Sequence, residues 1–432
     1  MSTKSYSFAM AERMSLTQAM HNMAMRNELK VLRLGTEGQV PDGYSLNEHE
    51  MTELCEALEM HEAGDCCPLQ VLDLRAIKIG DPAALKLRNT LACLTGLVEI
   101  NLDCCRIGYP NTLTHQTVNI VELLRSVHLE VINLKGNCLK TLIELPKCAR
   151  LRVLNLSCCS LGDNLELVCR SLVSAQCINL EELTLSDNNL SELGFAASSE
   201  LKNVLTINPK LRVLDLLGCE LGGQDLKEVL KGLAMCSLLN ELNLCGNTVD
   251  DDLEGFVKVL QNVSNLQHLH LGMCGLFSAS SMKQLGDALA ECAALCTLKL
   301  MCNQFGDMGV QSLAHLLSRN SSIDHLVVHS CGAGQEGILA LGLALQTRAK
   351  PKSGAHVRTC GSICACVCVC FCVCVCVCVR MCVSVCVNSI YTYIYVYIYI
   401  YVCVSHIYIY IFVYICTLRV PNKTTTFFLC ER

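Results

Sequence analysis

The sequence predicts an α/β solenoid in which short parallel strands alternate with helices, followed by a low-complexity C-terminal tail. Two observations support this. A leucine-spaced pattern, seen in LRVLNLSCCSLGD from Leu151, returns every 27–31 residues from there to the copy at Ile323, and less regular copies precede it from Leu29 onward. From residue 353 the composition changes to Cys–Val and then Tyr–Ile alternation. We therefore expect three parts: residues 1–28, residues 29–352 and residues 353–432.

Each copy of the pattern predicts one strand, one turn and one helix. Alternating leucines in a strand share one face. The stretch that follows is amphipathic in residues 308–321, where apolar residues are three and four apart. One such unit is too small to bury its own leucines, so neighbouring units stack. We expect about eleven units, with a parallel sheet on a concave side, helices on a convex side, and an incomplete repeat or cap helix in residues 1–28.

The residue at the turn after each strand alternates between Cys and Asn. If the first Leu of each copy is position one, this turn residue is at position nine. A side-chain amide or thiol there can bond backbone groups that the bending chain leaves unpaired. The nine turn residues are Cys105, Asn137, Cys159, Asn188, Cys219, Asn247, Cys274, Asn303 and Cys331.

This alternation resembles the ribonuclease-inhibitor-type leucine-rich repeat family, in which two repeat types alternate in the same way. Similar repeats form the sensor region of NOD-like receptors. The resemblance implies a horseshoe-shaped leucine-rich repeat solenoid that binds other proteins, and it does not imply a particular partner.

Charge and cysteine content indicate an intracellular protein. The net charge is −6; residues 353–432 contribute +4, so the remainder carries −10. The N-terminus has no apolar core long enough for a signal peptide. The cysteines upstream of the tail are therefore expected to be reduced thiols. We expect a cytoplasmic protein, with the nucleus as the alternative.

No motif predicts catalysis or a cofactor. The sequence has no GxxxxGK[ST] phosphate loop, no GxSxG and no HExxH. Adjacent cysteine pairs such as Cys158-Cys159 lack the spacing of zinc ligands, so no metal is expected. Cys104, Cys158 and Met273 directly precede turn residues, where partial exposure would make them sensitive to oxidation.

Positions three, five and seven of each strand are expected to face the concave surface. The charges there are mostly acidic, which favours a basic protein partner and disfavours nucleic acid. Histidines gather in the last repeats, where they are either ordinary surface residues or a basic, pH-responsive patch for an acidic partner. The candidate binding residues are Arg33, Asp73, Arg75, Glu99, Asp103, Lys135, Glu182, Asp215, Glu241, His268, His270, Lys299, His325 and His329.

Together these features predict a non-catalytic protein-binding scaffold. One alternative is a membrane-anchored repeat protein held by the apolar tail, and another is a detached NOD-like receptor sensor region. Ribonuclease inhibition is disfavoured because the chain has no Trp and its terminal repeats carry histidines. A TG repeat encodes Cys–Val and a TA repeat encodes Tyr–Ile, so residues 353–432 are interpreted as a translated dinucleotide repeat. A membrane is a partner only if this tail inserts.

Overall fold

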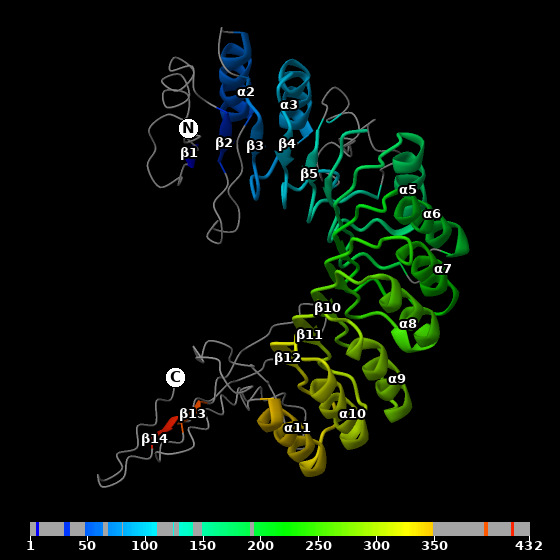
Figure 1. The fold of residues 1–432 in the computed structure, drawn as a ribbon. Coiled ribbons are helices and arrows are strands. Elements are labelled where there is room, and N and C mark those ends of the chain that lie inside the picture. Colours follow the sequence, from blue (N-terminus) through cyan, green and yellow to red (C-terminus); the bar gives the residue numbers. More distant parts are fainter. Residues whose placement is uncertain are drawn as a thin grey trace. The chain divides into compact units, whose positions relative to one another are not determined.

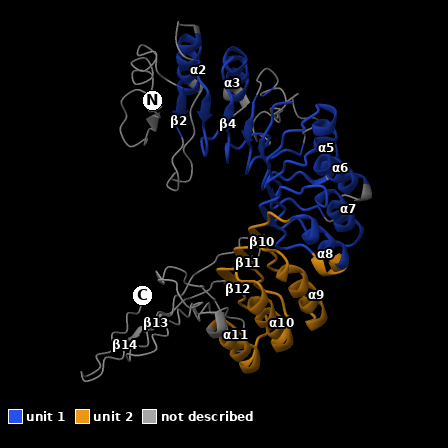
Figure 2. Cartoon of the chain, in the orientation of Figure 1, with its two compact units in different colours: residues 1–247, 254–263 blue, residues 248–253, 264–432 orange. Residues whose placement is uncertain are grey.

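The structure is a computed structural model. It describes residues 6–7, 30–34, 48–63, 68–79, 81–109, 124, 129–140, 149–190, 194–348, 393–395 and 416–418. The chain divides into two compact units (Figure 2). Unit 1 comprises residues 1–247 and 254–263, and unit 2 comprises residues 248–253 and 264–432.

Unit 1 is a stack of strand–helix repeats (Figure 1). Its strands are parallel and pair in chain order, so that Val153 lies opposite Glu182, and Glu182 opposite Val213. Its strands are β1 (Tyr6–Ser7), β2 (Val31–Arg33), β3 (Val71–Asp73), β4 (Glu99–Asn101), β5 (Val131–Asn133), β6 (Val153–Asn155), β7 (Glu182–Thr184), β8 (Val213–Asp215) and β9 (Glu241–Asn243). Its helices are α2 (Glu48–Ala63), α3 (Asp81–Cys93), α5 (Leu165–Ser174), α6 (Gly194–Ile207) and α7 (Gly223–Leu233), with a 3-10 turn at Gly162–Asn164.

Unit 2 repeats the same plan. Strands β10 (His268–His270), β11 (Thr297–Lys299) and β12 (His325–Val327) pair in parallel, and helices α9 (Ala279–Ala290), α10 (Gly306–Arg319) and α11 (Gln335–Arg348) follow them. A 3-10 turn at Val249–Asp252 also lies in unit 2, whereas α8 (Leu253–Asn262) belongs to unit 1 apart from Leu253. Two further strands, β13 (Tyr393–Tyr395) and β14 (Cys416–Leu418), pair antiparallel within the C-terminal tail. The α/β leucine-rich repeat solenoid predicted from the sequence is confirmed.

The core lies between the strands and the helices. The leucines at positions four and six are buried in successive repeats, as at Leu154 in β6 and Leu156 directly after it. The helices supply the other side, because Leu313 and Leu317 of α10 are also buried. Burying a leucine side chain stabilises a fold by about 1.5–3 kcal/mol. Positions three and five, which alternate with these leucines, face away from the helices.

The Asn residues at position nine connect neighbouring repeats. Asn188 is fully buried, and its Nδ2 donates to the carbonyls of Leu156 and Leu185, both at 2.8 Å. Its Oδ1 accepts from the backbone N–H groups of Cys159 and Leu161, both at 3.1 Å. One amide thus satisfies four backbone groups, three of them in the preceding repeat. Asn137, Asn247 and Asn303 are buried with the same type of bonding.

The Cys residues at position nine also bond carbonyls of the preceding repeat, but each thiol bonds fewer backbone groups than an Asn amide does. The buried thiol of Cys219 donates to the carbonyl of Leu185 at 3.3 Å, and that of Cys331 to the carbonyl of Leu300 at 3.2 Å. Burial raises the pKa of both thiols to about 12. These cysteines are therefore neutral structural groups rather than nucleophiles.

Position eight has a left-handed backbone in every described repeat from Ala76 to Ser330. Gly136, Gly218 and Gly246 suit this conformation, whereas Met273, with φ of 54°, does not. The N–H of Met273 donates to the carbonyl of Met301 in the next repeat at 2.9 Å. Hydrogen bonding between repeats thus continues past the strand and holds the turn in this conformation.

Several predicted features lie outside the described residues. These are residues 1–28 apart from Tyr6–Ser7, where an incomplete repeat or cap helix is expected, and most of the tail. Strand β1 pairs with β2, so a strand precedes the expected N-terminal helix. Among the helices that the structure describes, none is long and apolar enough to span a membrane.

Candidate protein-binding surface

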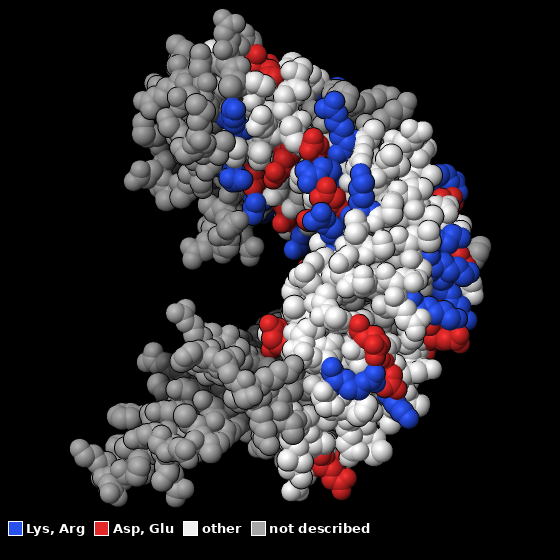
Figure 3. Space-filling view, in the orientation of Figure 1, with Lys and Arg blue, Asp and Glu red and all other residues white. Residues whose placement is uncertain are grey.

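The strand face opposite the helices carries the candidate binding residues. Strand register places position three of each repeat beside position three of the next, and the same holds for position five. Figure 3 shows acidic and basic residues interspersed over the part of unit 1 that holds β3–β5. The charges on this face differ in their surroundings, and that difference decides which of them can meet a partner.

Three candidates at the N-terminal end of unit 1 bind one another. The Asp73 carboxylate is buried and accepts from the Arg75 guanidinium at 2.6 Å. Arg33 approaches the same carboxylate at 4.0 Å. The side chains of Arg33 and Arg75 remain 41% and 28% exposed, while that of Asp73 is only 3% exposed. A partner would therefore meet two guanidinium groups here rather than an acid.

The next candidates combine both signs of charge. Glu99 and Asp103 are half-buried, and Lys135 is exposed. Asp103 Oδ1 is buried and has no hydrogen-bond partner among the described atoms. A mixed surface of this kind favours neither a basic nor an acidic partner.

Position five caps the end of its own strand. The Oδ1 atoms of Asn133 and Asn155 accept from the N–H two residues later, at 3.1 and 3.0 Å. Asp215 makes the same bond to the N–H of Leu217 at 3.0 Å. Asp215 is therefore held by its own strand end, and this bond occupies one of its oxygens.

An acidic group lies on strands β7–β9. Glu182 is exposed, and Asp215 and Glu241 are half-buried. Burial raises the pKa of Asp215, and the nearby charges of Glu241 and Asp187 raise it further. Asp187, which precedes Asn188, was not predicted as a site residue. No Lys or Arg occupies positions three, five or seven of these three strands.

A charged row along position two was also missed from the sequence. Arg152 donates two bonds to Glu181, both at 3.0 Å, and lies 3.6 Å from Glu130. These residues occupy position two of three consecutive repeats. The alternation of acidic and basic residues at that position could have predicted the row from the sequence. The charges of this row therefore neutralise one another along one edge of the sheet.

The histidines lie on unit 2. His268 is in register with Thr297, which is in register with His325, so two strand spacings separate the two histidines. Burial lowers the pKa of His270 to about 4, with further lowering by Lys299, His268 and His325. Burial also lowers the pKa of His329. His270 and His329 therefore remain neutral at physiological pH, which argues against them as pH-responsive groups.

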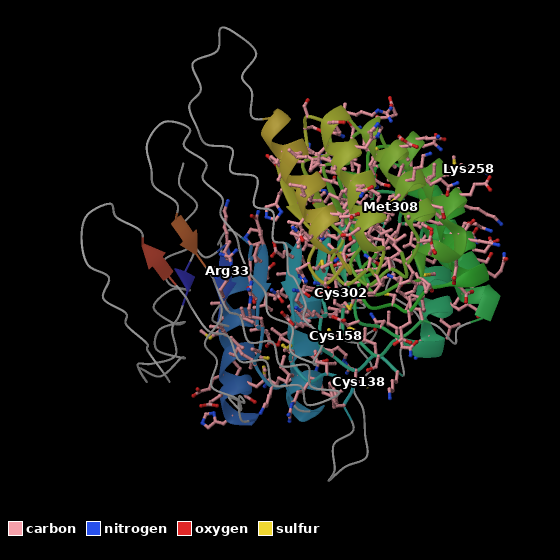
Figure 4. The ribbon with its side chains drawn as sticks, turned by 90° about the horizontal axis from the view of Figure 1, so that it is seen from below. Arg33, Cys138, Cys158, Lys258, Cys302 and Met308 are labelled. Atoms are coloured by element: carbon pink, nitrogen blue, oxygen red, sulfur yellow. The ribbon has the colours of Figure 1, made fainter. Side chains whose placement is uncertain are left out.

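The described cysteines form no metal site, and the thiols of Cys104 and Cys158 near the turns have raised pKa values. Among the described residues, no group of three His, Cys, Asp or Glu side chains could hold a metal ion. Figure 4 labels Cys138 and Cys158, which both belong to unit 1. Cys104 is exposed, but partial burial and Asp103 raise its pKa to about 11. Burial and Asp187 also raise the pKa of Cys158, so neither thiol favours the reactive thiolate form.

Comparison with known proteins supports the class of repeat. The family described as "Leucine Rich repeat" matches residues 294–314. Ribonuclease inhibitor of Mus musculus is 30% identical over 159 residues, covering 36% of this chain and 34% of that protein. "NACHT, LRR and PYD domains-containing protein 14" of Mus musculus is 34% identical over 214 residues, covering 47% of this chain and 20% of that protein. Protein 12 of the same group in Homo sapiens is 29% identical, covering 58% of this chain and 27% of that protein.

The chain thus contains leucine-rich repeats of the ribonuclease-inhibitor type, as its sequence predicted. It spans about a third or less of the length of these three relatives.

Proposed function

We propose that this protein is a non-catalytic, cytoplasmic scaffold that binds a basic segment of a partner protein on the strand face of unit 1. The observation that supports this most directly is the acidic group on β7–β9. Glu182 and Glu241 are two strands apart and in register with Val213 between them. Neighbouring strands are about 4.8 Å apart, so the two carboxylates are offered about 10 Å from one another.

The physical basis is preorganisation. Each strand is fixed by its neighbours, by the buried leucines and by the turn amides, so the charged side chains start from ordered backbone positions. Binding then costs little backbone ordering entropy, and more of the interaction energy is available as affinity. A lysine- or arginine-containing segment laid across the strands would meet Glu182 and Glu241 in succession.

A double substitution tests this proposal. A fluorescein-labelled lysine-rich peptide would be titrated against the full chain and the Glu182→Gln/Glu241→Gln variant. Each partly exposed ion pair contributes about 0.2–1 kcal/mol, so the loss of two should weaken binding roughly 2- to 30-fold. The matched control is Glu56→Gln/Glu254→Gln, which removes the same charge from helices α2 and α8. Equal affinities of all three proteins would refute the proposed surface.

A detached sensor region is the second candidate function, favoured by the similarity to the NACHT, LRR and PYD domains-containing proteins. In that case the partner is a separate chain that carries the nucleotide-binding module. Co-expression of the full chain with such a module, followed by size-exclusion chromatography, tests it. Co-elution supports this candidate, and separate elution of two folded proteins counts against it.

A further inference from the structure

The strand face of unit 2 carries hydrogen-bond donors and no acid. Positions three, five and seven of its three strands supply nine residues, none of which is Asp or Glu. They are His268, His270, Gly272, Thr297, Lys299, Met301, His325, Val327 and His329. We call these nine residues the donor face. Its composition contrasts with β7–β9 of unit 1, where the charged residues at the same positions are all acidic.

Strand register fixes how these donors are spaced. His268, Thr297 and His325 form one row across the three strands, and His270 and Lys299 form a second row beside it. Neighbouring strands are about 4.8 Å apart, and positions three and five along a strand are about 7 Å apart. The donors thus cover an area of roughly 10 by 7 Å, which suits a short peptide segment rather than a single ion.

The donor face is electropositive. Lys299, His268 and His325 each contribute to lowering the pKa of His270, so all three lie close enough to act on its imidazole. Among the described residues of unit 2, the ion pairs use other groups: Arg319 binds Asp287 and Glu291 on α9. None of the ion pairs within the described part of the chain involves Lys299. A carboxylate brought to this face would gain a charge-assisted bond without displacing an internal partner.

We propose that the donor face binds an acidic segment of a partner protein in a polyproline II conformation. This helix has three residues per turn and advances about 3.1 Å per residue, so acidic residues three positions apart share one face and are spaced by about 9 Å. That spacing matches the separation of His268 and His325 across Thr297. A segment with Glu at every third position should therefore bind better than one with the same number of adjacent Glu residues.

A nucleic acid is a poorer fit for the same face. Affinity for a phosphate backbone comes from several Lys and Arg side chains, each neutralising one phosphate. The donor face has a single Lys and no Arg. Imidazoles and a hydroxyl provide directed hydrogen bonds, which suit carboxylates at defined positions more than a uniform line of phosphates.

This inference rests on the proposed use of the strand face for protein binding, but it can fail independently because it concerns different strands and the opposite charge. The full chain would be titrated with four labelled probes by fluorescence anisotropy: a Glu-x-x-Glu peptide, a peptide of adjacent Glu residues, a neutral peptide of the same length and a single-stranded RNA. We expect binding of the first peptide to exceed that of the other three.

Charge substitutions then locate the contact. Lys299→Glu should weaken the Glu-x-x-Glu peptide about tenfold, since it removes one ion pair and adds a repulsion. Lys283→Glu, on the exposed face of α9, changes the net charge equally and should leave the affinity unchanged. His325→Asn, which keeps a polar side chain, should give an intermediate loss. Circular dichroism melting curves would verify that each variant is folded.

Three outcomes overturn the inference: no preference for the Glu-x-x-Glu peptide, equal effects of Lys299→Glu and Lys283→Glu, or tighter binding of the RNA. Binding of the lysine-rich peptide to Glu182 and Glu241 is measured separately. If the lysine-rich peptide did not bind, the proposed function of unit 1 would be refuted. If that peptide bound as predicted but the Glu-x-x-Glu peptide did not, only the proposal for the donor face would be refuted.

Discussion

Replacement of Asn188 by Ala should cost far more stability than replacement of a turn cysteine. The amide of Asn188 satisfies two carbonyls, at Leu156 and Leu185, and two N–H groups, at Cys159 and Leu161. A buried backbone group left without a partner costs about 1–3 kcal/mol. Because water can enter the vacated space, we take the lower figure for each of the four groups, which gives a loss of about 4 kcal/mol.

Cys219→Ala is the matched control. It removes the thiol that donates to the carbonyl of Leu185 at 3.3 Å and, more weakly, to that of Leu217 at 3.8 Å, and the rest of the side chain is apolar. The expected loss is about 1–2 kcal/mol. The difference between the two variants should therefore be at least about 2 kcal/mol in the free energy of unfolding.

Urea denaturation followed by circular dichroism measures the two losses. Repeat arrays can unfold in parts, so hydrogen exchange at the amides of Cys159 and Leu161 would report the local effect directly. Both amides should exchange faster in Asn188→Ala and keep their protection in Cys219→Ala. If Asn188→Ala were no less stable than Cys219→Ala, the assigned role of the turn amide would be wrong.

Two further predictions concern titratable groups. Because burial raises the pKa of Asp215 in the folded state, its carboxylate form destabilises the fold above that pKa. Asp215→Asn, whose Oδ1 can keep the strand-end bond, should therefore raise the free energy of unfolding at pH 7. The gain should vanish below about pH 3, where Asp215 is protonated in both states, and urea titrations at the two pH values decide this. Cys159 and Cys219, with pKa values of about 12, should resist iodoacetamide at pH 8 while exposed Cys93 reacts, as mapped by mass spectrometry; equal labelling rates in the folded protein would contradict their burial.

The repeat architecture could be predicted from the sequence because its signal is periodic. Leu154 and Leu156 belong to a pattern that returns in every unit, so the strand face that forms the core follows from spacing alone. The left-handed backbone at position eight could not be predicted, since Cys, Met, Asp, Ser and Ala occupy it as well as Gly. Hydrogen bonds between repeats set that conformation, and no local preference of Met273 would indicate it.

The candidate surface was predicted less completely, because spacing gives the direction of a side chain but not its neighbours. Asp73 was counted as an exposed acid, yet Arg75 covers it. Asp215 was counted as a binding charge, yet it caps its own strand end. Asp187 was missed because a turn residue does not follow the strand alternation. The sequence therefore identifies the strand face, and the contacts identify which of its charges are available.

The most direct test of protein binding on the strand face compares two charge-reversed proteins with the unmodified chain as bait. Glu182→Arg/Glu241→Arg changes the strand face, and Glu56→Arg/Glu254→Arg makes the same change in charge on helices α2 and α8. Partners captured from cytosolic extract would be quantified by mass spectrometry. We predict that proteins retained by the unmodified chain and the helix variant are lost from the strand variant. Retention of the same basic proteins by all three would contradict binding on strands β7–β9 of unit 1.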